Sequence, residues 1–407
     1  MFRPFASVLF LGALLAGAPS TAETGAPDPA DWESVLEAAQ GQEVYFHAWG
    51  GDPRRNDYIS WAAEEVEDRY GVRVTQVKLA DTGEAVARVA AEKAAGRDEG
   101  GAVDLIWING PNFAAMKREG LLFGPWAEDL PNWKFVDVEG KPTVVNDFTV
   151  PTDGYEAPWG MAQIIFYHDT ERLAEPPRSI AALGDWAAEN PGRFAYPQPP
   201  DFLGVSFLKQ AAVELVTEPE ALQQPVDRTA YDAMTAPLWD WLDALQPNLW
   251  RSGRAYPATG TTLKQLLADG EIELAYSFNQ SEASAAIANG ELPGSVRSYV
   301  FDEGTIGNAN FVAIPFNANA KAGAMVFANF LMSPEAQAYA QDPAILGNFT
   351  VLDVANLPDA ERARFEALDL GVATLSPQEL GESLPEPHPS WMERLSEDWA
   401  RRYGLGN

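Results

Sequence analysis

Hydrophobic and polar positions along the chain predict strands and helices in alternation. Residues 43–49 are mostly β-branched or aromatic, as in a buried strand, and they lead into Gly50, Gly51 and Asp52. Apolar residues then recur at helical spacing from Ile59 to Tyr70. Strand, glycine turn and helix form the first half of a βαβ unit, where ligands bind beyond the carboxyl ends of the strands. This stretch therefore predicts one wall of a binding cleft.

The same pattern recurs twice before residue 120. Residues 72–79 alternate apolar and polar side chains, and a helix follows from Asp81, with Glu84 at the spacing of a capping box. Residues 103–108 are nearly all apolar, as in a parallel strand covered on both faces, and a helix is expected over 113–119. The order βαβαβ predicts a doubly wound α/β sheet.

The rest of the chain predicts a second α/β lobe and then a return to the first. Strands are expected at 164–168, 193–196, 271–278, 296–301 and 311–315, with helices at 179–189, 207–216, 237–245, 261–268, 282–288 and 320–331. The chain is expected to cross between lobes near 157–163 and 302–310. This division places residues 23–161 and 305–345 in the first lobe, and residues 162–304 and 346–407 in the second. The tail from 343 to 403 is expected to be mostly helical and to pack outside.

Length and charge narrow the class of protein. The 407 residues suit two domains, and 28 Lys and Arg against 59 Asp and Glu give a net charge of −31. A nucleic acid or an anionic membrane would need a basic face, so neither is expected as a partner. The acidic surface is interpreted as solubilising, with attraction of cationic solutes as the alternative.

The first 22 residues have the pattern of a secretory signal. Arg3 precedes an apolar run over 8–16, and Ser20-Thr21-Ala22 resembles a cleavage site. The chain has no cysteine, which excludes disulfides and a lipid-anchored cysteine. A soluble periplasmic protein without membrane insertion is the expected product.

Enzyme signatures are missing from the sequence. It has no phosphate-binding loop, no G-x-S-x-G and no H-E-x-x-H, and His47, His168 and His388 are scattered. We therefore expect no catalytic residue, metal site or cofactor. The alternative from another class is a secreted hydrolase of a carbohydrate or similar small substrate.

Aromatic and small polar residues gather where strands end or where the chain crosses between lobes. Such residues suit a small-molecule site, although each has an ordinary explanation as a cap, turn or packing residue. The candidate ligand-binding residues are Trp49, Gly50, Gly51, Asp52, Asp81, Thr82, Asn109, Trp159, Gly160, Asn279, Asn308 and Asn310.

Five segments carry a family resemblance: 48–52, 103–110, 157–160, 308–315 and 333–337. They resemble extracytoplasmic solute-binding proteins of ABC transporters, of the two-lobed type II architecture, and are most similar to the YnjB-like group. The resemblance implies two α/β lobes that close about a hinge on one small solute. It also implies a monomer that docks on an inner-membrane permease, whose ATPase is a separate subunit.

The resemblance leaves the solute open. Proteins of this kind bind ferric ion, thiamine, polyamines, sugars or anions. The sequence has no Tyr-Tyr pair, which disfavours iron. Trp49 and Trp159 with Asp52 and Asp81 would suit an organic cation such as thiamine through cation–π and charge contacts, and the same set would suit sugar stacking.

Overall fold

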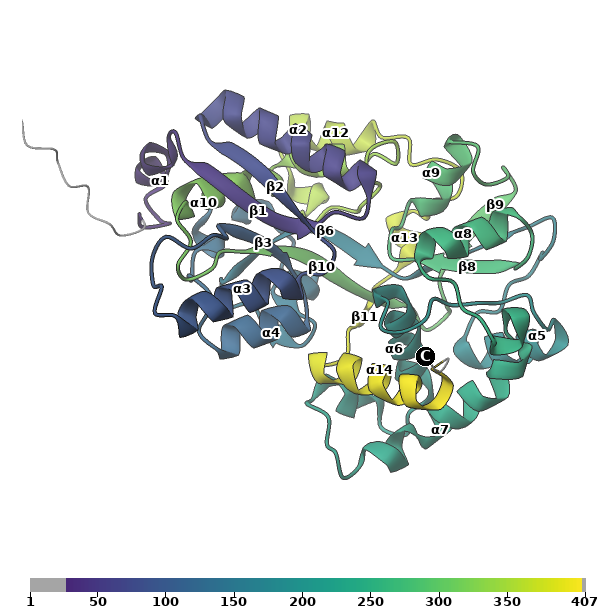
Figure 1. Ribbon diagram of the computed structural model, residues 1–407. Coiled ribbons are helices and arrows are strands. Elements are labelled where there is room, and N and C mark those ends of the chain that lie inside the picture. The colour runs from purple at the N-terminus through teal and green to yellow at the C-terminus, as the bar shows by residue number, and fades with distance from the viewer. Residues whose placement is uncertain (1–26, 405–407) are drawn as a thin grey trace, which may run out of the picture.

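The molecule has two α/β lobes connected by long strands (Figure 1). The structure is a computed structural model that describes residues 27–404, so the expected signal at residues 1–22 lies outside the described residues. The two-lobed α/β architecture expected from the sequence is confirmed. Within residues 27–404, no helix combines the length and the apolar character needed to cross a membrane.

The first lobe is built on a mostly parallel sheet. In this sheet β1 lies between β2 and β3 and parallel to both, and β10 runs antiparallel on the far side of β3. Its strands are β1 (Glu43–Trp49), β2 (Arg73–Leu79), β3 (Leu105–Ile108), β6 (Glu156–Gln163) and β10 (Ile306–Ala313), with β11 (Leu384–Pro385) at one edge. A small hairpin of β4 (Asn146–Asp147) and β5 (Val150–Pro151) lies beside it.

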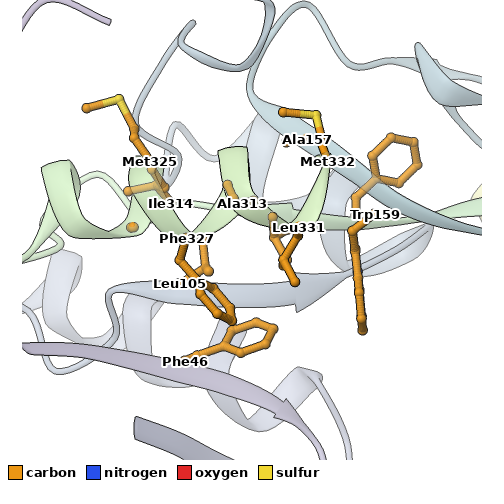
Figure 2. Close-up of a cluster of buried hydrophobic side chains, with 14 of the residues drawn as sticks. Phe46, Leu105, Ala157, Trp159, Ala313, Ile314, Met325, Phe327, Leu331 and Met332 are labelled. Carbon is orange, nitrogen blue, oxygen red and sulfur yellow. The ribbon is translucent and has the colours of Figure 1, made fainter. Parts of the chain in front are cut away.

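Helices cover this sheet and supply most of its core. They are α1 (Trp32–Ala39), α2 (Pro53–Tyr70), α3 (Gly83–Ala94), α4 (Pro111–Arg118), α10 (Lys321–Leu331), α11 (Pro334–Gln341) and α12 (Asp359–Glu366). Figure 2 shows how β1 and α10 meet in the core, where the rings of Phe46 and Phe327 pack edge to face with centroids 5.6 Å apart. Ser333 caps α11 by accepting a hydrogen bond from the Ala336 N–H, as its Ser-Pro start predicts.

The second lobe has a smaller sheet. Its central strand β7 (Ile165–Asp169) runs antiparallel to both β8 (Leu274–Ser277) and β9 (Val296–Tyr299). The surrounding helices are α5 (Ile180–Glu189), α6 (Phe202–Leu215), α7 (Tyr231–Leu245), α8 (Gly260–Ala268), α9 (Glu282–Ala288), α13 (Pro377–Leu380) and α14 (Pro389–Tyr403). Buried residues of these elements form a hydrophobic cluster separate from that of the first lobe.

Strands β6 and β10 connect the lobes. They pair antiparallel from Ala313 opposite Glu156 to Gly307 opposite Gln163. On its other edge β10 pairs with β3 at Phe311–Ala313 and with β11 at Ile306 and Gly307. Its two ends belong to different lobes, because Phe311–Ala313 lie in the first core cluster and Ile306 lies in the second. Figure 1 shows both strands running from one lobe into the other. Closure of two lobes needs a few connecting residues that can change their backbone angles, and these strands are the connection from which such a hinge would be built.

Three local expectations differ from the structure. The crossings at 157–163 and 302–310 contain strand, because long-range pairing outweighs the breaker residues Pro158 and Gly160. The strand expected at 193–196 is wrong: only Phe194 makes an isolated bridge, to Leu274. Val351, Leu352 and Phe365 belong to the core cluster of the first lobe, whereas the sequence-based division placed residues from 346 onward in the second.

Candidate functional site

The ends of β1, β2 and β3 lie at one edge of the first sheet. These strands are parallel neighbours, so the loops that follow them emerge side by side. Thr82 Oγ1 donates to the carbonyl oxygen of Trp107 at 3.3 Å, which ties the loop after β2 to strand β3. Asn109 Nδ2 donates to the carbonyl oxygen of Ala309 at 2.5 Å and ties the same edge to the hinge strand β10. The structure thus brings these candidate residues together at the hinge.

Carboxylates of the chain cap the helices that begin at this edge. Asp52 accepts from the Arg54 N–H at 3.0 Å, and Asp81 accepts from the Gly83 N–H at 2.7 Å. The capping box expected at Asp81 is half present, since the Glu84 side chain accepts from the Asp81 N–H but helix α3 begins at Gly83. Asp52 and Asp81 therefore stabilise helix ends, where a negative charge is favourable.

Two of the candidate asparagines make contacts that join distant segments. Asn279 Nδ2 donates to the Leu346 carbonyl oxygen at 2.6 Å. Asn308 Nδ2 donates to Glu386 Oε1 at 2.9 Å. Asn310 lies opposite Gly160 in the register of the hinge strands. A Cβ on Gly160 would meet Asn348 Nδ2 at 3.3 Å, so the glycine permits close packing at the hinge.

Three tryptophans form a row from the surface into the core. Trp49 is 40% exposed and stands edge-on to Trp107, with ring centroids 6.3 Å apart. Trp107 in turn meets Trp159 edge-on at 5.3 Å. Trp159 is 2% exposed and stacks on Tyr58. Trp49 is thus the most accessible member of the row, whereas Trp159 is part of the core that supports it.

A buried guanidinium covers this tryptophan row. Arg55, in the first turn of α2, is 9% exposed, and its Cζ lies 4.8 Å from the Trp107 ring centroid and 5.6 Å from that of Trp159. Nη2 makes one long contact to Asn348 Oδ1 at 3.5 Å, and neither Nε nor Nη1 has a hydrogen-bond partner among residues 27–404. Burial lowers the pKa of Arg55, although an arginine stays charged in proteins.

Arg55 is absent from the residues singled out in the sequence. The signal that could have found it is its phase, because Arg55 lies on the same helical face as the buried residues Ile59, Ala62 and Val66. A charged residue within an apolar stripe is unusual, since burial of a charge is costly. Asn348 was also missed, because the tail after residue 343 was expected to pack outside.

The segment 343–348 joins the lobes beside Arg55. Arg54 donates to the Pro343 carbonyl oxygen at 3.3 Å and forms an ion pair at 3.6 Å with Glu282 of the second lobe. A Cβ on Gly347 would meet the Ser281 Cβ at 2.4 Å, so this segment lies directly against the loop after β8. The base of the site therefore contains groups from both lobes.

The lobes also meet at a buried ion pair. Lys209 of α6 and Glu386 are 2.6 Å apart and are both almost fully buried. The ring of Phe148, from the β4–β5 hairpin of the first lobe, lies 4.6 Å from Lys209 Nζ. Burial raises the pKa of the nearby Asp147, although its bond to the Gly110 N–H and the charge of Lys209 act in the opposite sense.

The two histidines that lie on strands are engaged by the backbone. His47 and His168 each contact a backbone carbonyl oxygen through Nδ1, at 3.3 and 2.7 Å. No group of three or more His, Asp or Glu side chains in residues 27–404 is arranged to hold a metal ion. The site offers aromatic surface, amides, helix ends and a buried guanidinium with two unpartnered nitrogens, which is the composition of a binding site.

Comparison with known proteins agrees with this geometry. The model of the bacterial extracellular solute-binding protein family matches residues 61–364. The chain is 44% identical over 374 residues to Protein YnjB of Escherichia coli (strain K12), covering 92% of this chain and 94% of that protein. Its fold is similar to the periplasmic binding protein AfuA from Actinobacillus pleuropneumoniae, solved with fructose-6-phosphate bound (TM-score 0.60, 17% identity, 90% of this chain and 99% of that chain). It is also similar to iron-bound HitA from Pseudomonas aeruginosa (TM-score 0.57, 18% identity, 88% and 98%).

Proposed function

The chain belongs to the bacterial extracellular solute-binding proteins, and from this we propose that it captures one small solute between its lobes and delivers it to an ATP-driven permease. Proteins of this family bind solutes and are not enzymes. The proposal includes export to the periplasm with removal of residues 1–22, and action as a monomer. The ATPase would be a separate subunit, since the sequence has no phosphate-binding loop.

The pairing of β6 with β10 between the lobes is the observation that carries this proposal, with these strands acting as the hinge. A solute that touches both lobes favours the closed form over the open form, because only the closed form offers both sets of contacts. Groups from both lobes lie beside the row of tryptophans, as the contacts of segment 343–348 illustrate. Solute capture and lobe closure would thus be the same equilibrium.

The structure leaves fewer side chains free to bind the organic cation that the sequence favoured. Asp52 and Asp81 cap helices, and Trp159 is buried. The faces of Trp107 and Trp159 already meet the guanidinium of Arg55, which would repel a second cation. Thiamine and other organic cations, sugars and ferric ion remain competing solutes in the test below.

The test is a thermal-shift screen of residues 23–407, unfolded and refolded first to remove any solute acquired from the host. A solute at about 100 times its dissociation constant should stabilise the protein by about 2.7 kcal/mol. A hit should bind one per chain in calorimetry, return chemically unchanged, and reduce the radius of gyration in X-ray scattering. Binding without any change in radius would contradict the hinge mechanism, and consumption of the solute would contradict the binding role.

A further inference from the structure

We propose that Arg55 binds an anionic group of the solute, a carboxylate or a phosphate. This inference rests on the proposed function and specifies the chemistry of its site. It starts from a buried cation whose donors Nε and Nη1 are without partners in residues 27–404.

The other cations near the lobe contacts are paired. Lys209 meets Glu386 at 2.6 Å, Arg54 meets Glu282 at 3.6 Å, and Lys264 meets Glu282 at 2.9 Å. Arg55 has no carboxylate within 4.0 Å anywhere in the described chain. The chain has 59 acidic residues, so a shortage of carboxylates does not explain the missing partner.

The neighbouring carboxylate is already engaged. Asp52 is the acidic residue whose charge most affects Arg55, yet its side chain accepts a hydrogen bond from the Arg54 N–H. The N-terminus of helix α4 is likewise occupied, because the Asp147 side chain accepts a hydrogen bond from the Gly110 N–H at 2.6 Å. Among the buried cations at this edge, Arg55 is therefore the one whose free donors a negative group from outside could meet.

The surroundings of Arg55 suit recognition of a solute. The rings of Trp107 and Trp159 hold its guanidinium in place, so little side-chain freedom is lost when a ligand binds. Asn348 contacts Nη2, and the backbone at Leu346 is bonded to Asn279 of the second lobe. A carboxylate or phosphate bound at Arg55 would thus be sensed by the segment that joins the lobes. Charge-assisted hydrogen bonds of this kind are short and strong.

The experiment compares four proteins: the wild type, Arg55→Gln, Arg55→Lys and the control Arg73→Gln. Arg73 is exposed and forms an ion pair with Glu67 at 3.4 Å, so its replacement makes the same change in net charge away from the site. The probes are inorganic phosphate, fructose 6-phosphate, succinate and glutamate as anions, thiamine and putrescine as cations, and glucose as a neutral solute. Melting temperatures with and without each probe are followed by calorimetry on every hit.

We expect an anionic probe to stabilise the wild type and Arg73→Gln equally. Arg55→Gln should bind it about 10- to 100-fold more weakly, as expected for lost hydrogen bonds to a charged group. Arg55→Lys keeps the charge and should retain part of the affinity. Without a probe, Arg55→Gln should melt no lower than the wild type, because removal of the guanidinium leaves no buried carboxylate unpaired. Binding of inorganic phosphate or fructose 6-phosphate would indicate a phosphate site, and binding of succinate or glutamate would indicate a carboxylate site.

Several results would overturn the inference. Stabilisation by thiamine, putrescine or glucose that is unchanged in Arg55→Gln would refute the anion site and leave the proposed function standing. Failure of every probe, of either charge or none, would count against solute binding itself and hence against both. Full anion affinity in Arg55→Gln would refute the anion site at any melting temperature. If Arg55→Gln melts well below the wild type, complete loss of anion affinity in Arg55→Lys would assign Arg55 a structural role.

Discussion

Replacement of Glu156 by glutamine should change the free energy of unfolding in a pH-dependent way. The value for Glu156→Gln minus that for the wild type should be larger at pH 8 than at pH 5. Glu156 begins the hinge strand β6 and is fully buried, and neither carboxylate oxygen has a hydrogen-bond partner among the described residues. Burial, and then the charge of Asp147, raises its pKa well above the usual value. Lys117 acts in the opposite sense, but its ammonium group is bonded to Asp153 at 2.6 Å.

The sign of the effect follows from proton linkage. Below the ordinary glutamate pKa of about 4.3, the folded and unfolded chains both hold the proton. As the pH rises above that value, the unfolded chain releases the proton while the folded chain keeps it, so the free energy of unfolding falls. The loss is at most about 1.4 kcal/mol per pH unit and ends at the raised pKa of the folded state. Between pH 5 and 8 it amounts to at most about 4 kcal/mol.

The assay is urea unfolding followed by circular dichroism at pH 5, 6, 7 and 8 and constant ionic strength. The free energy of unfolding of Glu156→Gln, minus that of the wild type, should increase with pH, because glutamine has no proton to release. Glu139→Gln is the control, since Glu139 is exposed and its loss changes the net charge equally. A difference that stays flat from pH 5 to 8, or that Glu139→Gln reproduces, would refute the reasoning.

Three further substitutions test the contacts between and within the lobes. Phe148→Ala removes the ring over Lys209 and should lower the free energy of unfolding by about 3 kcal/mol. It should also enlarge the radius of gyration in X-ray scattering, and an unchanged radius would contradict the role of Phe148 between the lobes. Glu386→Gln should destabilise by about 3–5 kcal/mol in urea at pH 7, because Lys209 is left charged and buried, and wild-type stability would refute this. Ser333→Ala should lower stability by about 1 kcal/mol through loss of the α11 cap, which an unchanged urea midpoint would disprove.

Several elements of the fold follow from local sequence alone. Helix α9 occupies the expected residues 282–288. The apolar run at 103–108 predicted β3, because a strand covered on both faces has no polar face to show. Ser333-Pro334 predicted the start of α11 from capping chemistry. These features depend on interactions between residues a few positions apart, which a single sequence displays.

The site is predictable in outline and not in detail. The strand ends did indicate the edge where Asn109, Thr82 and Trp107 meet. The sequence could not show which candidate side chains are hydrogen-bonded to other parts of the protein. Asn308, for example, donates to Glu386, a residue 78 positions away. Arg55 was missed for the same reason, as its neighbours Trp107, Trp159 and Asn348 come from three distant segments.

By itself, the sequence determined the alternation of strands and helices, the division into two α/β lobes, the lack of enzyme motifs and the resemblance to solute-binding proteins. Only the tertiary structure decided that residues 156–163 and 306–313 are paired strands between the lobes, and that the buried Arg55 has no carboxylate partner within residues 27–404. The physical reason is that strand pairing, burial and charge compensation depend on residues brought together from far along the chain. Periodicity reports only the local preference of each segment.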